Sequence, residues 1–472
     1  MPKAEIYNQP KVFTVWSDKI KKRIDPYFYN PFFIKIINSI ENLNFKRVKL
    51  VEIADIFSGA RPKGGVGNIS TGVPSLGGEH VLLTGEIKID KLKFIPQDFH
   101  DNHLNSAVKS NDIILVKDGA TTGKVGIIPL DYLYKECNIN EHVFAIRIKD
   151  IKNIIPEYIF AFLASNLGQV QIKREITGAT VTGLTRESVK NLKIPLPSLK
   201  IQNKIVNVIQ KAYLDKKEKE IEANELLESI DNYVLDELGI KMPEINKEMV
   251  FKIMSDKVEN SRMDVRYWQP FLEEIKQIIN KGKYKTQKLK IFITKIHYGA
   301  STSNAYVDGG IPLLSILNLK LNHFNISNVV YLPENFRKKL GNAFVDSGDL
   351  LISRSGTVGV VSVVPKEVDG FAFGSFMIKF CLNDKINKEF VSIWLNNKLN
   401  KFLTEREKIG AVQGNITIGT IKNFDIPVPP LTIQNKIVEK VQSYYSQAQK
   451  LKDEASSDLQ KAKNKVEEMI LG

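Results

Sequence analysis

Apolar residues recur at steps of three and four positions in two stretches of the chain, which is the spacing of one helix face. These positions are Ile201, Ile205, Val208 and Ala212 in the first stretch and Ile433, Ile437, Val441 and Tyr444 in the second. Each stretch follows a Pro-x-Pro segment that ends any preceding strand, because proline lacks an amide donor and forces extended geometry before it. The pattern predicts long helices over residues 200–238 and from residue 432 to 472.

Both predicted helices carry apolar residues at heptad spacing, which is typical of helices that pack on each other. The positions predicted to pack are Ile205, Ala212, Leu226 and Ile230 in the first helix and Ile437, Val441, Ala448, Leu451, Ala455 and Val466 in the second. Lys216 and Lys219 also fall on this seam. We expect an antiparallel coiled coil with pseudo-twofold symmetry. The alternative is that each helix packs only on its own globular domain.

The segment that begins the first helix occurs twice. Residues 191–206 (NLKIPLPSLKIQNKIV) and 423–438 (NFDIPVPPLTIQNKIV) share eleven of sixteen residues at an offset of 232. An offset of this size indicates duplicated domains, because solenoid repeats have periods of about 20–50 residues. Both repeats end in Leu-Gly, at residues 238–239 and 471–472. The predicted division is a globular domain over 1–198, a helix over 199–239, a second globular domain over 240–430 and a second helix over 431–472.

Each globular half shows the same order of predicted helices and strands. The predicted helices are residues 33–42 and 156–165 in the first half and 271–280 and 388–395 in the second. The predicted strands are residues 50–57 and 111–116 in the first half and 289–296 and 348–353 in the second. Glycine-rich turns follow at 119–123 and 356–359, and polar turns at 178–183 and 410–414. The fold class expected is therefore α+β, with two similar domains.

Composition restricts the function further. With 43% apolar residues in 472 the chain can build ordinary cores, yet it has no apolar run of membrane-spanning length and no signal peptide at its start, so we expect a cytoplasmic protein. Its two cysteines lie in different halves, too few for a disulfide framework or a zinc site. The formal net charge of +14 favours a polyanionic partner such as nucleic acid.

No motif predicts catalysis. The segment from Gly119 to Lys124 resembles a phosphate loop, but Asp118 stands where the motif requires glycine and Val125 where it requires Ser or Thr. Residues 30–33 (NPFF) lack the second proline of the amino-methyltransferase motif. We find no catalytic triad, metal ligand set or paired carboxylates. The sequence predicts a non-catalytic chain with no cofactor of its own.

The polar loops contain the residue types that bind DNA. Base edges are read by Arg, Lys, Asn, Gln, Ser and Thr, and phosphates are held by cations and hydroxyl groups. The candidates in the first half are Arg61, Lys63, Asn68, Lys117, Thr121, Thr122, Lys124, Thr180 and Thr182. Those in the second half are Tyr298, Ser301, Thr302, Asn304, Arg354, Ser355, Thr357, Gln413 and Asn415.

Taken together, these motifs resemble the specificity subunits of type I restriction-modification systems. The marks are the openings Arg23/Asp25/Tyr29/Pro31 and Arg262/Asp264/Trp268/Pro270, the strand-turn segments 112–119 and 349–356, and the two IQNKIV helix starts. The resemblance covers essentially the whole chain. It implies that the globular domains are target recognition domains that read the two halves of a split site in double-stranded DNA, and that the paired helices set the spacer.

The resemblance also implies partners. Two modification subunits would carry S-adenosylmethionine and the adenine methyltransferase chemistry, and restriction subunits would supply ATP- and Mg-dependent translocation and cleavage. Two alternatives remain from the sequence. One is a methyltransferase or the specificity half of a fused restriction/methyltransferase enzyme, which would need the cofactor loop that we do not find. The other is a non-catalytic coiled-coil DNA-binding adaptor that reads no sequence.

Overall fold

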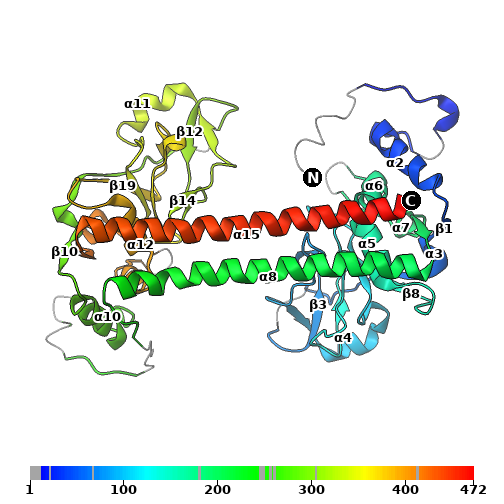
Figure 1. Ribbon diagram of the computed structural model, residues 1–472, viewed down its shortest axis with the longest axis horizontal. Coiled ribbons are helices and arrows are strands. Elements are labelled where there is room, and N and C mark those ends of the chain that lie inside the picture. Colours follow the sequence, from blue (N-terminus) through cyan, green and yellow to red (C-terminus); the bar gives the residue numbers. More distant parts are fainter. Residues whose placement is uncertain are drawn as a thin grey trace. The chain divides into compact units, whose positions relative to one another are not determined.

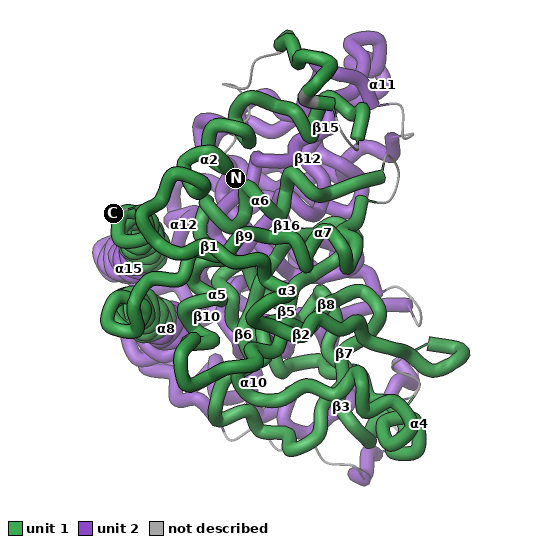
Figure 2. Tube along the Cα trace, turned by 90° about the vertical axis from the view of Figure 1, so that its right-hand side faces the viewer, with its two compact units in different colours: residues 1–220, 452–472 green, residues 221–451 purple. Residues whose placement is uncertain are grey.

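The computed structural model of the chain describes residues 12–20, 23–65, 69–178, 182–243, 250–254, 258, 262–302, 306–410 and 414–471. The chain forms two compact units, shown in different colours in Figure 2. Unit 1 contains Met1–Glu220 and Lys452–Gly472, and unit 2 contains Ile221–Leu451. These units divide the chain differently from the predicted repeats, because each includes part of both long helices.

The central strands and the helices around them follow the same order in both halves of the chain, and the second half adds the β13–β14 hairpin (Figure 1). The first half contains 3-10 turns η1 (Ser17–Lys19), η2 (Pro26–Tyr29), η3 (Gly78–His80) and η4 (Leu104–Ser106), helices α2 (Pro31–Glu41), α3 (Leu50–Ile53), α4 (Gln97–Asn102), α5 (Pro156–Ala164), α6 (Asn166–Glu175), α7 (Arg186–Lys190) and α8 (Leu199–Glu237), and strands β1 (Lys46–Lys49), β2 (Ala54–Ser58), β3 (Val73–Leu76), β4 (Lys93–Ile95), β5 (Ile113–Val116), β6 (Val125–Ile127), β7 (Asn138–Ile139), β8 (Val143–Ile148) and β9 (Lys193–Leu196). The second half contains 3-10 turns η5 (Leu289–Ile291), η6 (Glu334–Phe336) and η7 (Lys366–Val368), helices α10 (Pro270–Asn280), α11 (Arg337–Leu340), α12 (Lys388–Asn396), α13 (Lys398–Arg406), α14 (Ile418–Lys422) and α15 (Leu431–Leu471), and strands β10 (Thr286–Lys288), β11 (Ile293–Tyr298), β12 (Ile311–Leu314), β13 (Leu319–Lys320), β14 (His323–Phe324), β15 (Val330–Leu332), β16 (Leu350–Ser353), β17 (Val361–Val363), β18 (Ala372–Phe373), β19 (Met377–Leu382) and β20 (Asp425–Pro427).

A four-stranded antiparallel sheet forms the centre of unit 1, in the order β2-β8-β5-β6. Its middle strand β5 is buried on both faces, which explains its uninterrupted apolar sequence. Ile113 and Leu115 pack in the main core with α5, α6 and α8, whereas Ile114 and Val116 face the small β4-β3-β7 sheet. Unit 2 repeats this plan with sheets β11-β19-β16-β17 and β15-β12-β18. The sequence therefore predicted the fold class and the central strands correctly.

The strand predicted over residues 50–57 is wrong in its first half. Leu50–Ile53 form a single helical turn, and the strand begins only at Ala54. The Glu52 carboxylate accepts a hydrogen bond from the Lys49 amide at 2.9 Å, which stabilises the start of that turn. In the second half of the chain, Leu289–Ile291 likewise form a 3-10 turn before β11. Apolar spacing over eight residues does not separate such a turn from a strand.

The repeated glutamine of the IQNKIV segment fixes the start of each long helix. Gln202 is 2% exposed, donates to the Pro197 carbonyl at 3.0 Å and accepts from the Ile155 amide at 3.0 Å. Gln434 is 1% exposed and makes the matching bonds, to the Pro429 carbonyl at 2.8 Å and from the Asn387 amide at 2.8 Å. These bonds tie α8 and α15 to the segments that precede α5 and α12. These matching bonds explain why the glutamine is the same in both IQNKIV segments.

Within each unit, parts of α8 and α15 share one core. Ile205 and Ala212 lie in the core of unit 1 together with Val466, and Ile230 lies in the core of unit 2 together with Ile437 and Val441. The other four predicted packing residues are on the same helices, with Ala448 and Ala455 buried and Leu226 and Leu451 half-buried. The two helices therefore do not pack only on the domains that precede them.

The direction of this packing is antiparallel. In unit 2, Tyr233 of α8 contacts Tyr444 of α15, with ring centroids 5.9 Å apart. Glu237, which follows Tyr233 along α8, pairs at 2.7 Å with Lys436, which precedes Tyr444 along α15. Lys219, a charged residue on the predicted seam, pairs in unit 1 with Asp458 at 2.8 Å and Glu454 at 3.5 Å. Carboxylates of α15 therefore compensate this charge.

Carboxylates from the far ends of the long helices also cap helices of the globular parts. Glu467 of α15 accepts from the Asn166 amide, at the start of α6, at 2.6 Å. Asp231 of α8 accepts from the Lys398 amide, at the start of α13, at 3.4 Å. A carboxylate at a helix N-terminus satisfies an unpaired amide and the positive end of the helix dipole. Each unit is thus completed by a helix end that comes from the other repeat.

Candidate nucleic-acid interface

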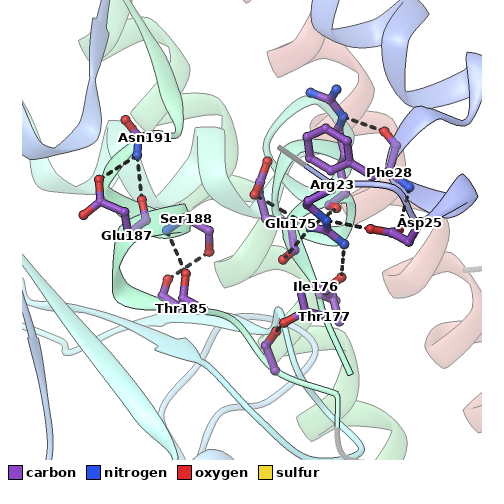
Figure 3. Close-up of polar contacts among 12 residues, drawn as sticks. Arg23, Asp25, Phe28, Glu175, Ile176, Thr177, Thr185, Glu187, Ser188 and Asn191 are labelled. Atoms are coloured by element: carbon purple, nitrogen blue, oxygen red, sulfur yellow. Dashed lines mark hydrogen bonds and ion pairs between the residues drawn. The ribbon is translucent and has the colours of Figure 1, made fainter. Parts of the chain in front are cut away.

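The opening segment of unit 1 is anchored by one arginine (Figure 3). The Arg23 guanidinium donates to the carbonyls of residues 174–176, at the end of α6, at 3.1–3.4 Å, and to the Asp25 carboxylate at 2.7 Å. The Tyr29 hydroxyl donates in turn to the Arg23 carbonyl at 2.7 Å. A cation at a helix C-terminus satisfies its last carbonyls and opposes the negative end of the helix dipole. This arrangement holds the opening segment beside the polar turn that follows α6.

Unit 2 has the same anchor. Arg262 donates to the Arg406 carbonyl, at the end of α13, at 3.2 Å, to the Lys408 carbonyl two residues further on, and to the Asp264 carboxylate at 3.0 Å. The Trp268 indole donates to the Arg262 carbonyl at 2.5 Å, as the Tyr29 hydroxyl does in unit 1. Tyrosine and tryptophan can replace each other here because both are aromatic hydrogen-bond donors. The repeated openings are therefore structural anchors.

We expect Arg23→Ala to lower the free energy of unfolding by about 2 kcal/mol, since the charged hydrogen bonds to partly buried carbonyls are lost. Equilibrium urea unfolding followed by circular dichroism measures this loss. Arg262→Ala is the matched variant and should behave alike. A change below about 0.5 kcal/mol in both variants would show that the anchor contributes little.

Three segments of unit 1 meet around a cleft of about 660 Å³. They are the opening segment, the glycine turn and the polar turn. The predicted residues Thr122 and Thr182 both line this cleft. The Thr122 hydroxyl donates to the Gly119 carbonyl at 2.6 Å and lies 3.4 Å from the Thr182 carbonyl, so the two turns are joined. Gly119 adopts φ of 88°, which only glycine adopts without strain.

The remaining unit 1 candidates lie in different surroundings. Lys117 donates to the Ser58 hydroxyl at 3.2 Å, and Lys124 donates to the Val81 carbonyl at 3.4 Å. Lys63 is exposed on the loop after β2, and Thr121 is half-buried in the glycine turn. Two further candidates, Asn68 and Thr180, lie outside the described residues.

Sequence reasoning missed a charged cluster beside the glycine turn of unit 1. The predicted Arg61 pairs with Glu141 at 2.7 Å, and His142 contacts Glu141 at 3.3 Å and Asp118 at 2.5 Å. The sequence does not reveal this cluster, because its residues lie far apart in the chain, in the loops after β2, β5 and β7. Two carboxylates here reduce the attraction of the loop for phosphate and offer acceptors for amino groups of bases.

The unit 2 candidates gather around the end of β16. The Arg354 guanidinium lies over the Tyr298 ring, with its central carbon 4.8 Å from the ring centroid. The buried Ser355 hydroxyl bonds the Asn415 side chain at 2.5 Å, which joins the glycine turn to the polar turn. Thr357 is exposed in the glycine turn. Of the other candidates, Ser301 is exposed and Thr302 is half-buried, while Asn304 and Gln413 lie outside the described residues.

Lys117 and Arg354 occupy the same position in the two units. The Lys117 amide donates to the His142 carbonyl at 3.0 Å, and its carbonyl accepts from the Leu184 amide at 2.7 Å. The Arg354 amide and carbonyl make the matching bonds to Phe376 and Ile416, at 2.9 and 3.0 Å. Each cation also lies over an aromatic ring, Phe144 at 5.3 Å for Lys117 and Tyr298 for Arg354. The fold therefore presents one cation at each of two matched sites.

The described residues contain no group of three or more His, Cys, Asp or Glu side chains placed to bind a metal ion. Within the same part of the chain, no helix combines the length and the apolar character that a membrane span requires.

Comparison with known proteins identifies the family. The model of the type I restriction modification DNA specificity domain matches residues 41–232 and again residues 268–459. The type I restriction enzyme MjaVIII specificity subunit of Methanocaldococcus jannaschii is 22% identical over 378 residues, covering 77% of this chain and 79% of that protein. The EcoKI specificity subunit of Escherichia coli K12 is 20% identical over 395 residues, covering 82% and 79%.

One solved structure supports the fold. It comes from a study of complex assembly and conformational transition of the type I restriction-modification system, and its chain is 16% identical with a TM-score of 0.52, covering 90% of this chain and 96% of that chain. The family model, which matches both halves over the elements described above, carries the assignment. The chain belongs to the family of type I restriction-modification DNA specificity proteins.

Proposed function

We propose that the loops around Lys117 in unit 1 and Arg354 in unit 2 each contact one half of a bipartite DNA site. The observation that carries this proposal is the recurrence of one arrangement in both units. In each, a cation at the end of the central strand lies over an aromatic ring, between a glycine turn and a polar turn. The net charge of +14 favours binding to the DNA backbone, while the differing loop residues suit two different half-sites.

The proposal extends to a complex with other subunits. The relatives are named as specificity subunits of type I restriction enzymes. Here we propose that two modification subunits bring S-adenosylmethionine and methylate adenine, and that restriction subunits bring ATP- and Mg-dependent translocation and cleavage. In this proposal the present chain catalyses no step, binds none of these cofactors and works in the cytoplasm.

Exchanging residues 20–198 for those of another family member tests whether each unit reads one half-site. We expect the exchanged chain, copurified with its modification subunits, to methylate sites in which one half has changed and the other has not. Mapping methylated adenines on a DNA library measures this. The donor segment must keep the apolar residues that pack against Val466 and Ile470, because these belong to the core of unit 1.

The reciprocal exchange, over residues 262–430, is the control and should alter only the other half-site. A simultaneous change of both halves in either chimera would contradict independent reading. Methylation by the isolated chain, without modification subunits, would contradict the non-catalytic role.

A further inference from the structure

The backbone of Arg354 is held on both sides. Its amide donates to the Phe376 carbonyl at 2.9 Å and its carbonyl accepts from the Ile416 amide at 3.0 Å. The residue therefore sits at a fixed point between the start of β19 and the polar turn. A side chain that starts from a fixed backbone loses less conformational entropy when it binds a ligand.

The guanidinium is also restrained. Its central carbon lies 4.8 Å from the centroid of the Tyr298 ring, and that ring is held by its hydroxyl, which accepts from the Ile418 amide at 3.3 Å. The Arg354 Nε atom is buried and has no hydrogen-bond partner among the described residues. No carboxylate of the described residues forms an ion pair with this side chain. Unit 2 thus presents a planar cation that lies over an aromatic ring and has no ion-pair partner among the described residues.

The matched site in unit 1 has different chemistry. Lys117 carries a compact ammonium group, already bonded to the Ser58 hydroxyl at 3.2 Å. Its next neighbour is Asp118, which is bonded to His142, whereas Arg354 is followed by the neutral Ser355. Lysine cannot present two parallel donors in one plane, as arginine can. Only the unit 2 site is therefore built for planar, two-point recognition.

Resting on the function proposed above, we propose that Arg354 reads a guanine in the half-site contacted by unit 2, donating to its O6 and N7 atoms in the major groove. Arginine to guanine O6 and N7 is the commonest base-specific contact of proteins with DNA. The glycine turn after Arg354 holds Ser355 and Thr357, and the Ser355 hydroxyl bonds the Asn415 side chain of the polar turn. Hydroxyl and amide side chains bind both base edges and phosphates, so the assignment to a base rests on the planar donor pair of the arginine.

The test uses the chain in complex with its modification subunits and a DNA pool with randomised half-sites. The exchange of residues 20–198 first identifies which half-site belongs to unit 2. The wild-type complex is expected to require guanine at one position of that half. Arg354→Gln should shift the preference there from guanine to adenine, because glutamine pairs with adenine N6 and N7, and should weaken binding to the wild-type site roughly 10- to 100-fold.

Two further variants make the result specific. Lys117→Gln is the matched control and should leave the unit 2 half-site unchanged. Arg354→Lys keeps the charge with a smaller structural change, and should relax the guanine preference even if the glutamine variant folds poorly. Thermal unfolding of each variant checks that it is folded.

Each contrary outcome has a distinct meaning. Uniform weakening on all sequences, with a salt dependence reduced by about one phosphate contact, would make Arg354 a backbone contact and overturn this inference while leaving the proposed function intact. A wild-type half-site without guanine, or an Arg354→Gln change in both halves, would also overturn it. A wild-type complex without sequence preference would overturn the proposed function itself.

Discussion

Asp349→Ala is expected to lower the free energy of unfolding by about 3 kcal/mol, because the buried Lys379 ammonium keeps only the exposed Asp346 carboxylate, 3.8 Å away, as an ion-pair partner. Asp349 is 7% exposed and pairs at 3.0 Å with Lys379, whose side chain is 9% exposed. The same carboxylate accepts from the Asp346 amide at 2.9 Å and from the Cys381 thiol at 2.9 Å. Burial and this bond raise the pKa of Cys381 to about 12, so the thiol stays protonated and donates. Equilibrium denaturant unfolding measures the loss.

Asp112→Ala is the matched control in unit 1. Asp112 pairs with Arg147 at 2.5 Å, but the Arg147 side chain is 34% exposed and water can solvate it after the change. A smaller loss is therefore expected. The double variant Asp349→Leu with Lys379→Met should recover most of the stability, since it removes both charges. Equal losses for the two single variants would show that burial of the cation is not the cause.

Removing one heptad from each long helix is expected to shift the two half-sites by about three base pairs, because seven residues span about 10 Å of helix. Lys219 pairs with both Glu454 and Asp458, so α8 and α15 face each other at these positions in unit 1. The heptads 216–222 and 453–459, each centred on this contact, can therefore be deleted together. Both half-sites should keep their sequences. Methylated adenines mapped with the deleted chain in complex measure the new spacer.

Deleting residues 216–222 alone is the control for this experiment. It moves α8 out of register with α15, so we expect a loss of soluble complex instead of a new spacer. An unchanged spacer after the paired deletion would contradict the expectation, implied by the family resemblance, that the helices set the distance between half-sites.

The long helices were the most predictable elements. The sequence placed the first over 200–238 and the structure has Leu199–Glu237, because apolar spacing, the preceding prolines and the repeat all agree. Lys216 and Lys219 interrupted that seam, and the sequence offered no partner for them. The structure pairs Lys216 with Glu220 of its own helix and Lys219 with carboxylates of α15. Pairing across two antiparallel helices depends on register, which one sequence does not reveal.

The sequence predicted which loops form the candidate site, but not how their side chains contact one another. Lys117 and Arg354 could be named because they follow recognisable buried strands that end in glycine turns. Their positions over the Phe144 and Tyr298 rings were not predictable, since these depend on the order of the strands in each sheet. The hydrogen bond between Asp118 and His142 was not predictable either, because the two residues are 24 positions apart in the sequence.

The contribution of the end of α15 to the core of unit 1 has a consequence for biosynthesis. The core of unit 1 includes Leu459, Val466 and Ile470, and its helix α6 is capped by Glu467. A ribosome reaches these residues only after it has translated all of unit 2. The first domain to emerge must therefore wait with an uncovered apolar surface, and a prematurely terminated chain would keep that surface exposed to chaperones and proteases.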